Sequence, residues 1–317
     1  MIQKFNLDDI EIYHTIGKGG YGKVNIARPK NNAAYFALKI LKKAHIIKTK
    51  QVDHVHSEFM LFKELQHPFI VKLLGYSQDV YNLYLAMEFV PGGDLFTHIR
   101  VCKFLPNIQS MLYSAQITMM IEYLHSKSII FRDLKPENIL IKHNGYLKLT
   151  DFGLAKIVPD RTYTFCGTPE YTAPEVILKN GYGSAVDWWS LGVIIYEMLA
   201  GVDPFHDQDP MKIYENILNC RIKFPRGFDK VSKSLIKHLL VLDLSKRYGN
   251  MKRGVEDIKK HRWFRGLEWE LLIFEAIQMP YIPPVRFQGD TSNFYRYPDS
   301  NSEPETINQQ EDPFGNW

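Results

Sequence analysis

The hydrophobic pattern of the chain changes once, at Pro91-Gly92-Gly93, and this change restricts the folds that the chain can adopt. Before this point, short apolar runs are separated by Gly, Asn and Pro, a pattern typical of β-strands joined by turns. Strands or apolar runs are expected at residues 11–16, 23–28, 34–41, 70–74 and 83–90. Residues 51–65 form the one segment there with helical spacing, so we expect a β-rich unit with one helix.

After the break the pattern is helical. One buried helix face is predicted from the i, i+3, i+4, i+7 spacing of Ile117, Met120, Ile121 and Leu124. Residues 186–199 are apolar nearly all round, which predicts a central helix that is buried on every side. The sequence therefore predicts an α+β, bilobal chain.

Three segments are expected along the chain. The small, β-rich lobe covers about residues 11–90, and the large, helical lobe covers about residues 91–265, hinged at the Pro-Gly-Gly segment. Residues 266–317 are rich in Pro, Ser, Asn and Tyr and have poor periodicity, so we expect an extended C-terminal tail.

Composition excludes several classes of protein. With 45% hydrophobic and 23% charged residues, the 317-residue chain has ample material for a core and is not disordered. The three cysteines are too few for a disulfide scaffold and are expected to be reduced. A membrane span needs about 20 apolar residues, whereas the most apolar stretch is residues 186–199 and contains two acids. Neither a secretory leader nor a lipidation signal is expected.

Charge is distributed unevenly. The segment from Asp290 onward has six acids and one base, or −5, and the remainder has 38 bases and 29 acids, or +9. No basic stripe interleaved with aromatics is present, so we interpret the surplus as solvated surface lysine and expect no nucleic-acid partner. The basic body and the acidic tail would attract each other, which favours a tail that lies on the globule.

A glycine-rich segment at residues 17–24 fits the pattern G-x-G-x-x-G-x-V. Glycines allow a backbone to fold closely over phosphates and to present N–H groups to them. A dinucleotide fold would require a helix after the glycines, but strands are expected on both sides, which favours a hairpin loop lying over a nucleotide. The alternative is an ordinary glycine-rich turn.

Further motifs follow in a fixed order. Lys39 lies in an apolar strand, where a charge is costly unless it is paired; Glu58 is the candidate partner, and an edge-strand lysine is the alternative. Residues 131–138 read Phe-Arg-Asp-Leu-Lys-Pro-Glu-Asn, in which Asp133 can accept a hydroxyl proton and Asn138 can bind a metal. Asp151, in Asp-Phe-Gly, is a hard carboxylate suited to Mg²⁺.

This ordered set resembles the eukaryotic protein kinases over about residues 11–265, with Ala173-Pro174-Glu175 closing the segment that begins at Asp151. Residues 167–171, 185–192 and 290–294 are similar to the AGC group, most closely to the cAMP-dependent kinases, and the cGMP-dependent kinases are the alternative. The resemblance implies a bilobal kinase fold with an AGC tail, and Leu154 and Lys135 resemble Ser/Thr rather than Tyr kinases.

The resemblance also implies residue roles. Catalysis would use Asp133, Lys135, Lys39, Glu58 and Thr168. ATP would contact Ile16, Gly17, Lys18, Gly19, Gly20, Tyr21, Gly22, Lys23, Val24, Ala37, Lys39, Met87, Glu88, Val90, Asp94 and Phe294. Two Mg²⁺ ions would be held by Asn138 and Asp151, and Asp187 would bind the catalytic-loop backbone or cap its own helix.

Substrate and regulatory residues are implied in the same way. Protein substrates with upstream Arg would contact Asp94, Glu137, Glu170, Glu197, Phe165, Pro169 and Thr172. The phosphosites would be Thr164 and Thr306, and the Thr164 phosphate would be cradled by His54, Arg132 and Lys156. Phe314 and Trp317 would dock the tail on the small lobe, with a frayed terminus as the alternative.

Three positions depart from the cAMP-dependent pattern. Phe131 replaces Tyr in the catalytic loop, where an aromatic ring preserves the packing. Thr172 replaces Leu in the wall that meets the residue after the phosphoacceptor, and Tyr163 replaces Trp on the surface that faces regulatory partners.

The implied function is ATP- and Mg²⁺-dependent phosphorylation of Ser/Thr in proteins, with a cyclic-nucleotide-binding regulatory subunit as partner. The expected location is the cytoplasm, and also the nucleus. A pseudokinase scaffold is the remaining alternative, and it predicts the loss of Lys39, Asp133 or Asp151, all of which are present.

Overall fold

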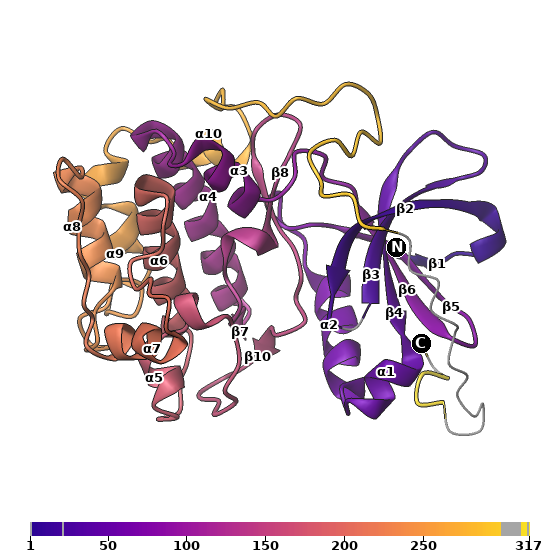
Figure 1. The fold of residues 1–317 in the computed structure, drawn as a ribbon, viewed down its shortest axis with the longest axis horizontal. Helices are drawn as coiled ribbons and strands as arrows, with labels where there is room; N and C mark the ends of the chain where they lie inside the picture. The colour runs from indigo at the N-terminus through magenta and orange to yellow at the C-terminus, as the bar shows by residue number, and fades with distance from the viewer. Residues whose placement is uncertain (1, 21, 299–311, 316) are drawn as a thin grey trace.

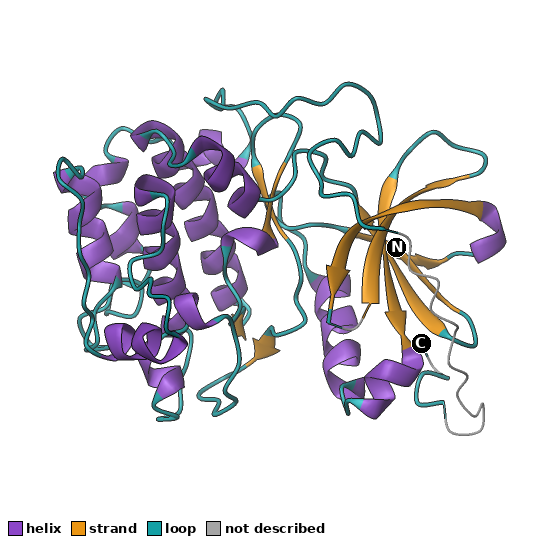
Figure 2. Cartoon of the chain, viewed as in Figure 1, coloured by secondary structure: helices purple, strands orange, loops and turns teal. Residues whose placement is uncertain are grey.

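The structure is a computed structural model that describes residues 2–20, 22–298, 312–315 and 317. Tyr21 and Thr306, two of the residues singled out above, lie outside this range. The chain forms a β-rich lobe and a helical lobe joined near residue 90, in agreement with the predicted bilobal α+β fold (Figures 1 and 2). No helix in the described part of the chain is long and apolar enough to cross a membrane.

The small lobe is built on a six-stranded sheet of order β1-β5-β6-β4-β3-β2. Its strands are β1 (Gln3–Lys4), β2 (Ile10–Gly19), β3 (Gly22–Pro29), β4 (Phe36–Lys42), β5 (Leu73–Gln78) and β6 (Asn82–Glu88). β1 runs parallel to β5, and the other neighbouring strands are antiparallel. The apolar run at residues 70–74 enters the sheet only from Leu73 onward.

Two helices, α1 (Lys43–Lys48) and α2 (Val52–Glu64), lie beside this sheet (Figure 1). Helix α2 matches the predicted segment and buries its Val55, Phe59 and Phe62 face. The prediction of a single helix is wrong, because α1 was missed. Six residues are too few to establish a helical period, and α1 instead depends on tertiary burial of Ile46.

The large lobe is helical. Its helices are α3 (Leu95–Cys102), α4 (Asn107–Ser126), α5 (Pro174–Ile177), α6 (Ala185–Ala200), α7 (Pro210–Leu218), α8 (Lys230–Leu239), α9 (Glu256–Lys259) and α10 (Trp269–Ile273). The central-helix prediction is confirmed, since every residue of α6 from Ala185 to Met198 is buried. Gly192 allows α8 to approach closely: a Cβ at this position would lie 2.9 Å from Leu239 and Leu240 side-chain atoms.

Two short antiparallel strand pairs form separate two-stranded sheets in the large lobe. β8 (Ile139–Ile141) pairs with β9 (Leu147–Leu149), and β7 (Ile129–Ile130) pairs with β10 (Lys156–Ile157). Residues 131–138 lie between β7 and β8, and Asp151 follows β9; because Ile139 pairs with Leu149, both segments emerge at the same edge of the β8–β9 pair.

The tail returns from the large lobe to the small one (Figure 1). At the hinge, Asn293 Nδ2 donates to the Pro91 carbonyl at 3.0 Å, and His14 Nε2 lies 2.7 Å from Thr291 Oγ1. Farther along the tail, Phe314 contacts His56 and Trp317 contacts Phe59, both in α2. The tail therefore contacts the small lobe at its last described residues.

Candidate active site

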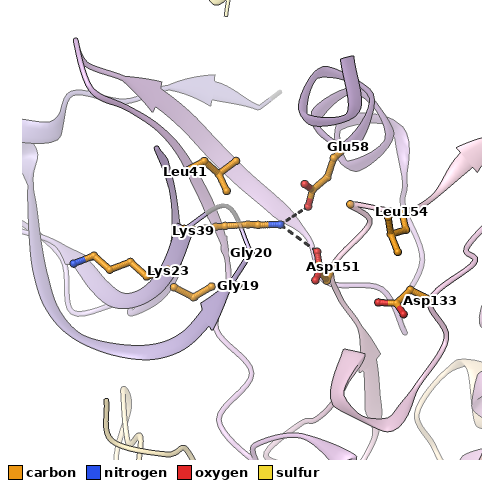
Figure 3. A pocket seen from close by; sticks show the side chains of 12 residues that line it. Gly19, Gly20, Lys23, Lys39, Leu41, Glu58, Asp133, Asp151 and Leu154 are labelled. Carbon is orange, nitrogen blue, oxygen red and sulfur yellow. Dashed lines mark hydrogen bonds and ion pairs between the residues drawn. The ribbon is translucent and has the colours of Figure 1, made fainter. Parts of the chain in front are cut away.

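A cavity of about 120 Å³ lies between the two lobes (Figure 3). The small lobe lines it with the glycine-rich hairpin and with β4 and α2, and the large lobe lines it with the segments around Asp133 and Asp151. Residues predicted from separate motifs therefore surround a single space.

Lys39 occupies the centre of this cavity (Figure 3). Its Nζ lies 2.6 Å from Glu58 Oε1 and 3.2 Å from Asp151 Oδ1, which joins β4, α2 and the large lobe through one ammonium group. Burial opposes the charge on Lys39, but the two carboxylates outweigh it and hold the pKa of Lys39 above its usual range. The Lys39 ammonium in turn lowers the pKa of Asp151. Lys39 and Asp151 are therefore charged at neutral pH, whereas burial raises the pKa of Glu58 against the opposing effect of the Lys39 ammonium.

The glycine-rich hairpin forms the roof of the cavity. β2 and β3 continue to their ends with Gly19 opposite Gly22. A Cβ at Gly22 would lie 1.8 Å from the Ile40 carbonyl oxygen, so no other residue fits there. Gly19 and Gly20 have no neighbour within 4 Å of a hypothetical Cβ, so open space adjoins both residues.

The floor of the cavity is a hydrogen-bonded cluster around Asp133. Thr168 Oγ1 donates to Asp133 Oδ1 at 3.0 Å, and Lys135 Nζ lies 2.8 Å from both Asp133 Oδ2 and Thr168 Oγ1. Asn138 Nδ2 donates to the Asp133 carbonyl at 2.9 Å and to Oδ2 at 3.1 Å. The Asp133 carboxylate is therefore fixed in orientation by groups on both sides.

Buried groups hold the backbone of this loop. Asp187 accepts the Phe131 and Arg132 N–H groups, each at 3.0 Å, and its Oδ2 lies 2.8 Å from His125 Nε2. Asp187 stands in the first turn of α6, but the N-cap residue is Ser184. The Phe131 ring is buried and packs edge-on against Phe152 at 5.1 Å, so an aromatic residue at this position fills an apolar site.

An apolar cluster lies near the hinge. Ile16 and Ala37 belong to a cluster that also includes Val24 and Phe294. Ala37 pairs with Met87 across β4 and β6, and Met87 and Val90 are buried. The Glu88 N–H donates to the Lys72 carbonyl at 2.9 Å, and the Glu88 side chain pairs with Lys148 at 2.8 Å.

Acidic side chains lie on the large-lobe side. Asp94 caps α3, with Oδ1 accepting the Thr97 N–H at 2.7 Å, so a helix-capping role accounts for part of its contacts. Glu197 is fully buried; its Oε1 pairs with Arg100 at 2.8 Å and its Oε2 accepts the Tyr171 hydroxyl at 2.5 Å. Burial raises the pKa of Glu197 to about 7.

Arg100 was not singled out from the sequence. It covers Glu197 from the solvent side, with 41% of its side chain exposed, and it also donates to the Gly201 carbonyl. The two partners are 97 residues apart, and no local pattern connects them.

Of the other predicted substrate residues, Glu137 is exposed and lies in the 3-10 turn Pro136–Asn138, and Glu170 is half-buried in the turn Pro169–Tyr171. Phe165 is 52% exposed. Thr172 is buried, and its hydroxyl donates to the Thr168 carbonyl at 2.8 Å. The Thr172 hydroxyl is thus already satisfied within the loop.

The residues around Thr164 are joined through Tyr182. The Tyr182 hydroxyl donates to the Thr164 carbonyl at 2.6 Å and lies 3.4 Å from the Arg132 guanidinium. Lys156 Nζ lies 3.5 Å from Thr162 Oγ1. His54 contacts Gln51 at 2.5 Å, and within the described residues no hydrogen bond or ion pair joins His54 to Arg132 or Lys156.

The chain end docks on the small lobe. Phe314 and Trp317 are 0% and 6% exposed. His56 contacts both rings, with centroids 5.4 Å from each, and Lys43 pairs with Asp312 at 2.7 Å. In the described structure, the alternative of a frayed terminus does not apply to these two side chains.

Comparison with known proteins gives one consistent family. The family profile described as "Protein kinase domain" matches residues 10–264. The chain is 52% identical over 295 residues to the cAMP-dependent protein kinase catalytic subunit PRKX of Mus musculus, which covers 93% of this chain and 83% of that protein. It is 48% identical over 315 residues to cAMP-dependent protein kinase type 3 of Saccharomyces cerevisiae, covering 98% and 78%. With PRKX of Homo sapiens the identity is 48% over 296 residues, covering 93% and 83%.

Proposed function

Because this chain belongs to the protein kinase family, we propose that it transfers the γ-phosphoryl group of ATP to serine or threonine hydroxyls of protein substrates. The observation that carries the proposal is the arrangement of Lys39, Asp133 and Asp151 around one cavity. A pseudokinase scaffold would have no need for Lys39 in contact with Glu58 and Asp151, or for Asp133 in contact with Lys135 and Thr168.

The donor set fits Mg²⁺. Asp151 has a half-exposed carboxylate at the cavity, and Asn138 uses its amide nitrogen for Asp133, so its amide oxygen is turned to another side. No group of three or more His, Cys, Asp or Glu that could hold a metal occurs in the described part of the chain. Mg²⁺ takes one or two protein oxygens together with phosphate and water, which the Asp151 carboxylate and the Asn138 amide oxygen could supply. When bound, the ions neutralise phosphate charge, and two are expected.

The chain's own residues would supply position and charge. Lys39 would bind the α- and β-phosphates while Glu58 holds its ammonium. Asp133, fixed by Thr168 and Asn138, would orient the substrate hydroxyl and accept its proton. Lys135 lies 2.8 Å from Asp133 and would offset charge on the transferred phosphoryl group. Phosphoryl transfer requires little covalent help, so orientation and electrostatics provide most of the acceleration.

We propose that substrates carry arginine upstream of the phosphoacceptor. The acids Asp94, Glu137, Glu170 and Glu197 favour a guanidinium over an ammonium, because carboxylates bind guanidinium in a bidentate manner. A substrate arginine reaches Glu197 only by sharing it with Arg100 or by displacing Arg100.

Two regulatory features belong to the same proposal. Phosphate on Thr164 would add about −1.5 to −2 charge near Arg132 and so order the segment. Thr164→Ala should therefore lower kcat while ATP still binds. Unchanged kcat in dephosphorylated protein would contradict this role of Thr164.

A cyclic-nucleotide-binding subunit is the proposed partner, since the relatives are named as cAMP-dependent catalytic subunits. No observation favours the cGMP-dependent alternative.

The central test uses Mg-ATP with an Arg-Arg-x-Ser peptide and matched peptides containing Thr, Tyr or Ala at the acceptor position. We expect phosphorylation of the Ser and Thr peptides only, and weaker kcat/KM when the arginines become Ala. Asp133→Ala and Lys39→Met should reduce turnover by more than the ~10²–10³ of one electrostatic donor. Asp243→Ala removes an exposed acid with a local lysine partner and serves as control. A variant of Asp133 or Lys39 that retains half the turnover would refute the assignment.

A further inference from the structure

The C-terminal end of α3 carries a polar cluster outside the cavity described above. Cys102 is the last residue of α3, and it is the exposed one of the three cysteines in the sequence. Its Sγ lies 3.8 Å from Nδ1 of His98, one helical turn earlier. This is within hydrogen-bonding distance for sulfur, so the thiol and the imidazole form a pair.

The orientation of His98 is set by its other neighbours. The Gln109 side-chain nitrogen, which can only donate, lies 2.9 Å from His98 Nε2, so Nε2 accepts. The neutral ring then carries its proton on Nδ1, directed at the Cys102 sulfur. Tyr281 stacks on the ring with centroids 4.0 Å apart, and burial lowers the pKa of His98, which keeps the imidazole neutral.

A second, independent feature is the Tyr113 hydroxyl. Tyr113 is 0% exposed, and its hydroxyl has no hydrogen-bond partner among the described residues. Burial raises the pKa of Tyr113, the Gln109 side chain opposes this rise, and Tyr281 and Cys102 also act on the hydroxyl. A buried hydroxyl without a hydrogen-bond partner is costly. An oxygen atom added to the Cys102 sulfur would offer the Tyr113 hydroxyl a hydrogen-bond acceptor.

The other two cysteines lack this arrangement. Cys220 is half-buried and donates to the Leu240 carbonyl at 3.2 Å, and burial raises the pKa of its thiol. Cys166 is half-buried and lies 3.7 Å from the Tyr182 hydroxyl. Exposure and an N–H donor aimed at sulfur therefore coincide only at Cys102.

We propose that Cys102 is a site of oxidation by hydrogen peroxide or an organic hydroperoxide. The thiol gives up its proton, and the sulfur, held by the His98 Nδ1–H, attacks one peroxide oxygen. The S–O bond forms as the O–O bond breaks, and the leaving hydroxide or alkoxide takes up the proton. The sulfur loses two electrons to give a sulfenic acid, and hydrogen peroxide is reduced to water, or an organic hydroperoxide to the corresponding alcohol.

The test follows sulfenic acid formation at each cysteine of the full chain by dimedone labelling and mass spectrometry during exposure to hydrogen peroxide. We expect Cys102 to be labelled about tenfold faster than Cys220, because exposure and a hydrogen bond to the thiolate both favour reaction. His98→Phe retains an aromatic ring against Tyr281 but removes the N–H, and it should slow labelling of Cys102 alone.

Two further variants guard against a folding defect in His98→Phe. Gln109→Met removes the donor that keeps the His98 proton on Nδ1, and it should also slow labelling of Cys102. Tyr113→Phe removes only the unpartnered hydroxyl, and it should shorten the lifetime of the sulfenic acid while leaving its rate of formation unchanged. Labelling of Cys102 at the rate of Cys220, or an unchanged Cys102 rate in a folded His98→Phe or Gln109→Met variant, would overturn the proposal.

Discussion

The Trp317 indole stacks on the Phe59 ring with centroids 4.5 Å apart, and Phe59 directly follows Glu58 in α2. Glu58 in turn lies 2.6 Å from the Lys39 ammonium. Trp317 therefore contacts the same helix, α2, that holds Glu58 against Lys39. Any displacement of α2 that follows loss of Trp317 acts on the Lys39–Glu58 pair.

Removal of residues 314–317 should lower both thermal stability and kcat. Truncating a buried aromatic side chain costs about 3–5 kcal/mol, and Phe314 and Trp317 are both buried. Thermal unfolding and steady-state kinetics would measure the two effects. Phe287→Ala, at a tail residue that is 63% exposed, is the matched control and should change neither. A truncated chain with the Tm and kcat of the intact one would exclude a coupling between the tail and α2.

Thr168→Ala should reduce kcat by about 10²-fold, because it removes a donor that fixes the catalytic carboxylate. The Thr168 hydroxyl donates to Asp133 at 3.0 Å and accepts from Lys135 at 2.8 Å, so its loss frees both side chains. Thr168→Ser retains the hydroxyl and should restore most of the activity. KM for ATP should change little in both variants. Equal activity of the Ala and Ser variants would show that the hydroxyl does not orient Asp133.

Contiguous motifs made much of this site predictable. The resemblance carried by the motifs around Lys39, Asp133 and Asp151 implied that these groups serve one site, and they line one cavity. The central helix α6 was also predictable, because a helix that is buried on all sides has no polar face in its sequence. In each case the information lies within short contiguous segments of the sequence.

Contacts between distant residues could not be predicted in the same way. The Lys43–Asp312 pair joins residues 269 positions apart, and the Arg100–Glu197 pair likewise brings together two segments with no local signal. Such pairs form only after the lobes and the tail have packed, since neither partner has a periodic or turn-forming signature. Helix α1 was missed for a related reason, because its stability comes from burial of Ile46 rather than from its own pattern.

Arg247→Ala should lower the free energy of unfolding by about 3–5 kcal/mol, the cost of breaking a buried ion pair. Arg247 is fully buried and binds Glu175 through two nitrogens, at 2.6 and 3.0 Å, and it also donates to the Ala185 and Val241 carbonyls. Denaturant unfolding would measure the loss.

The exposed pair between Arg221 and Glu215, at 3.1 Å, offers the matched control. Arg221→Ala should cost less than about 1 kcal/mol, because solvent screens an exposed pair. If both arginine variants lost the same small amount, the Arg247 network would not be a stabilising element.

The KM for arginine-containing peptides should rise as the pH falls through about 7. Burial raises the pKa of Glu197 to about 7, so the carboxylate is ionised above this pH and protonated below it. Only the ionised form attracts a guanidinium, and a bound arginine would itself keep Glu197 ionised, so the change should appear in KM and much less in kcat. Peptide kinetics between pH 6 and 8 would measure it. Glu197→Gln should give a high KM that no longer depends on pH in this range. With the unmodified enzyme, a peptide with Ala in place of the upstream arginines should also show a high KM that does not depend on pH. A pH-dependent KM that persists in Glu197→Gln would assign the titration to another group.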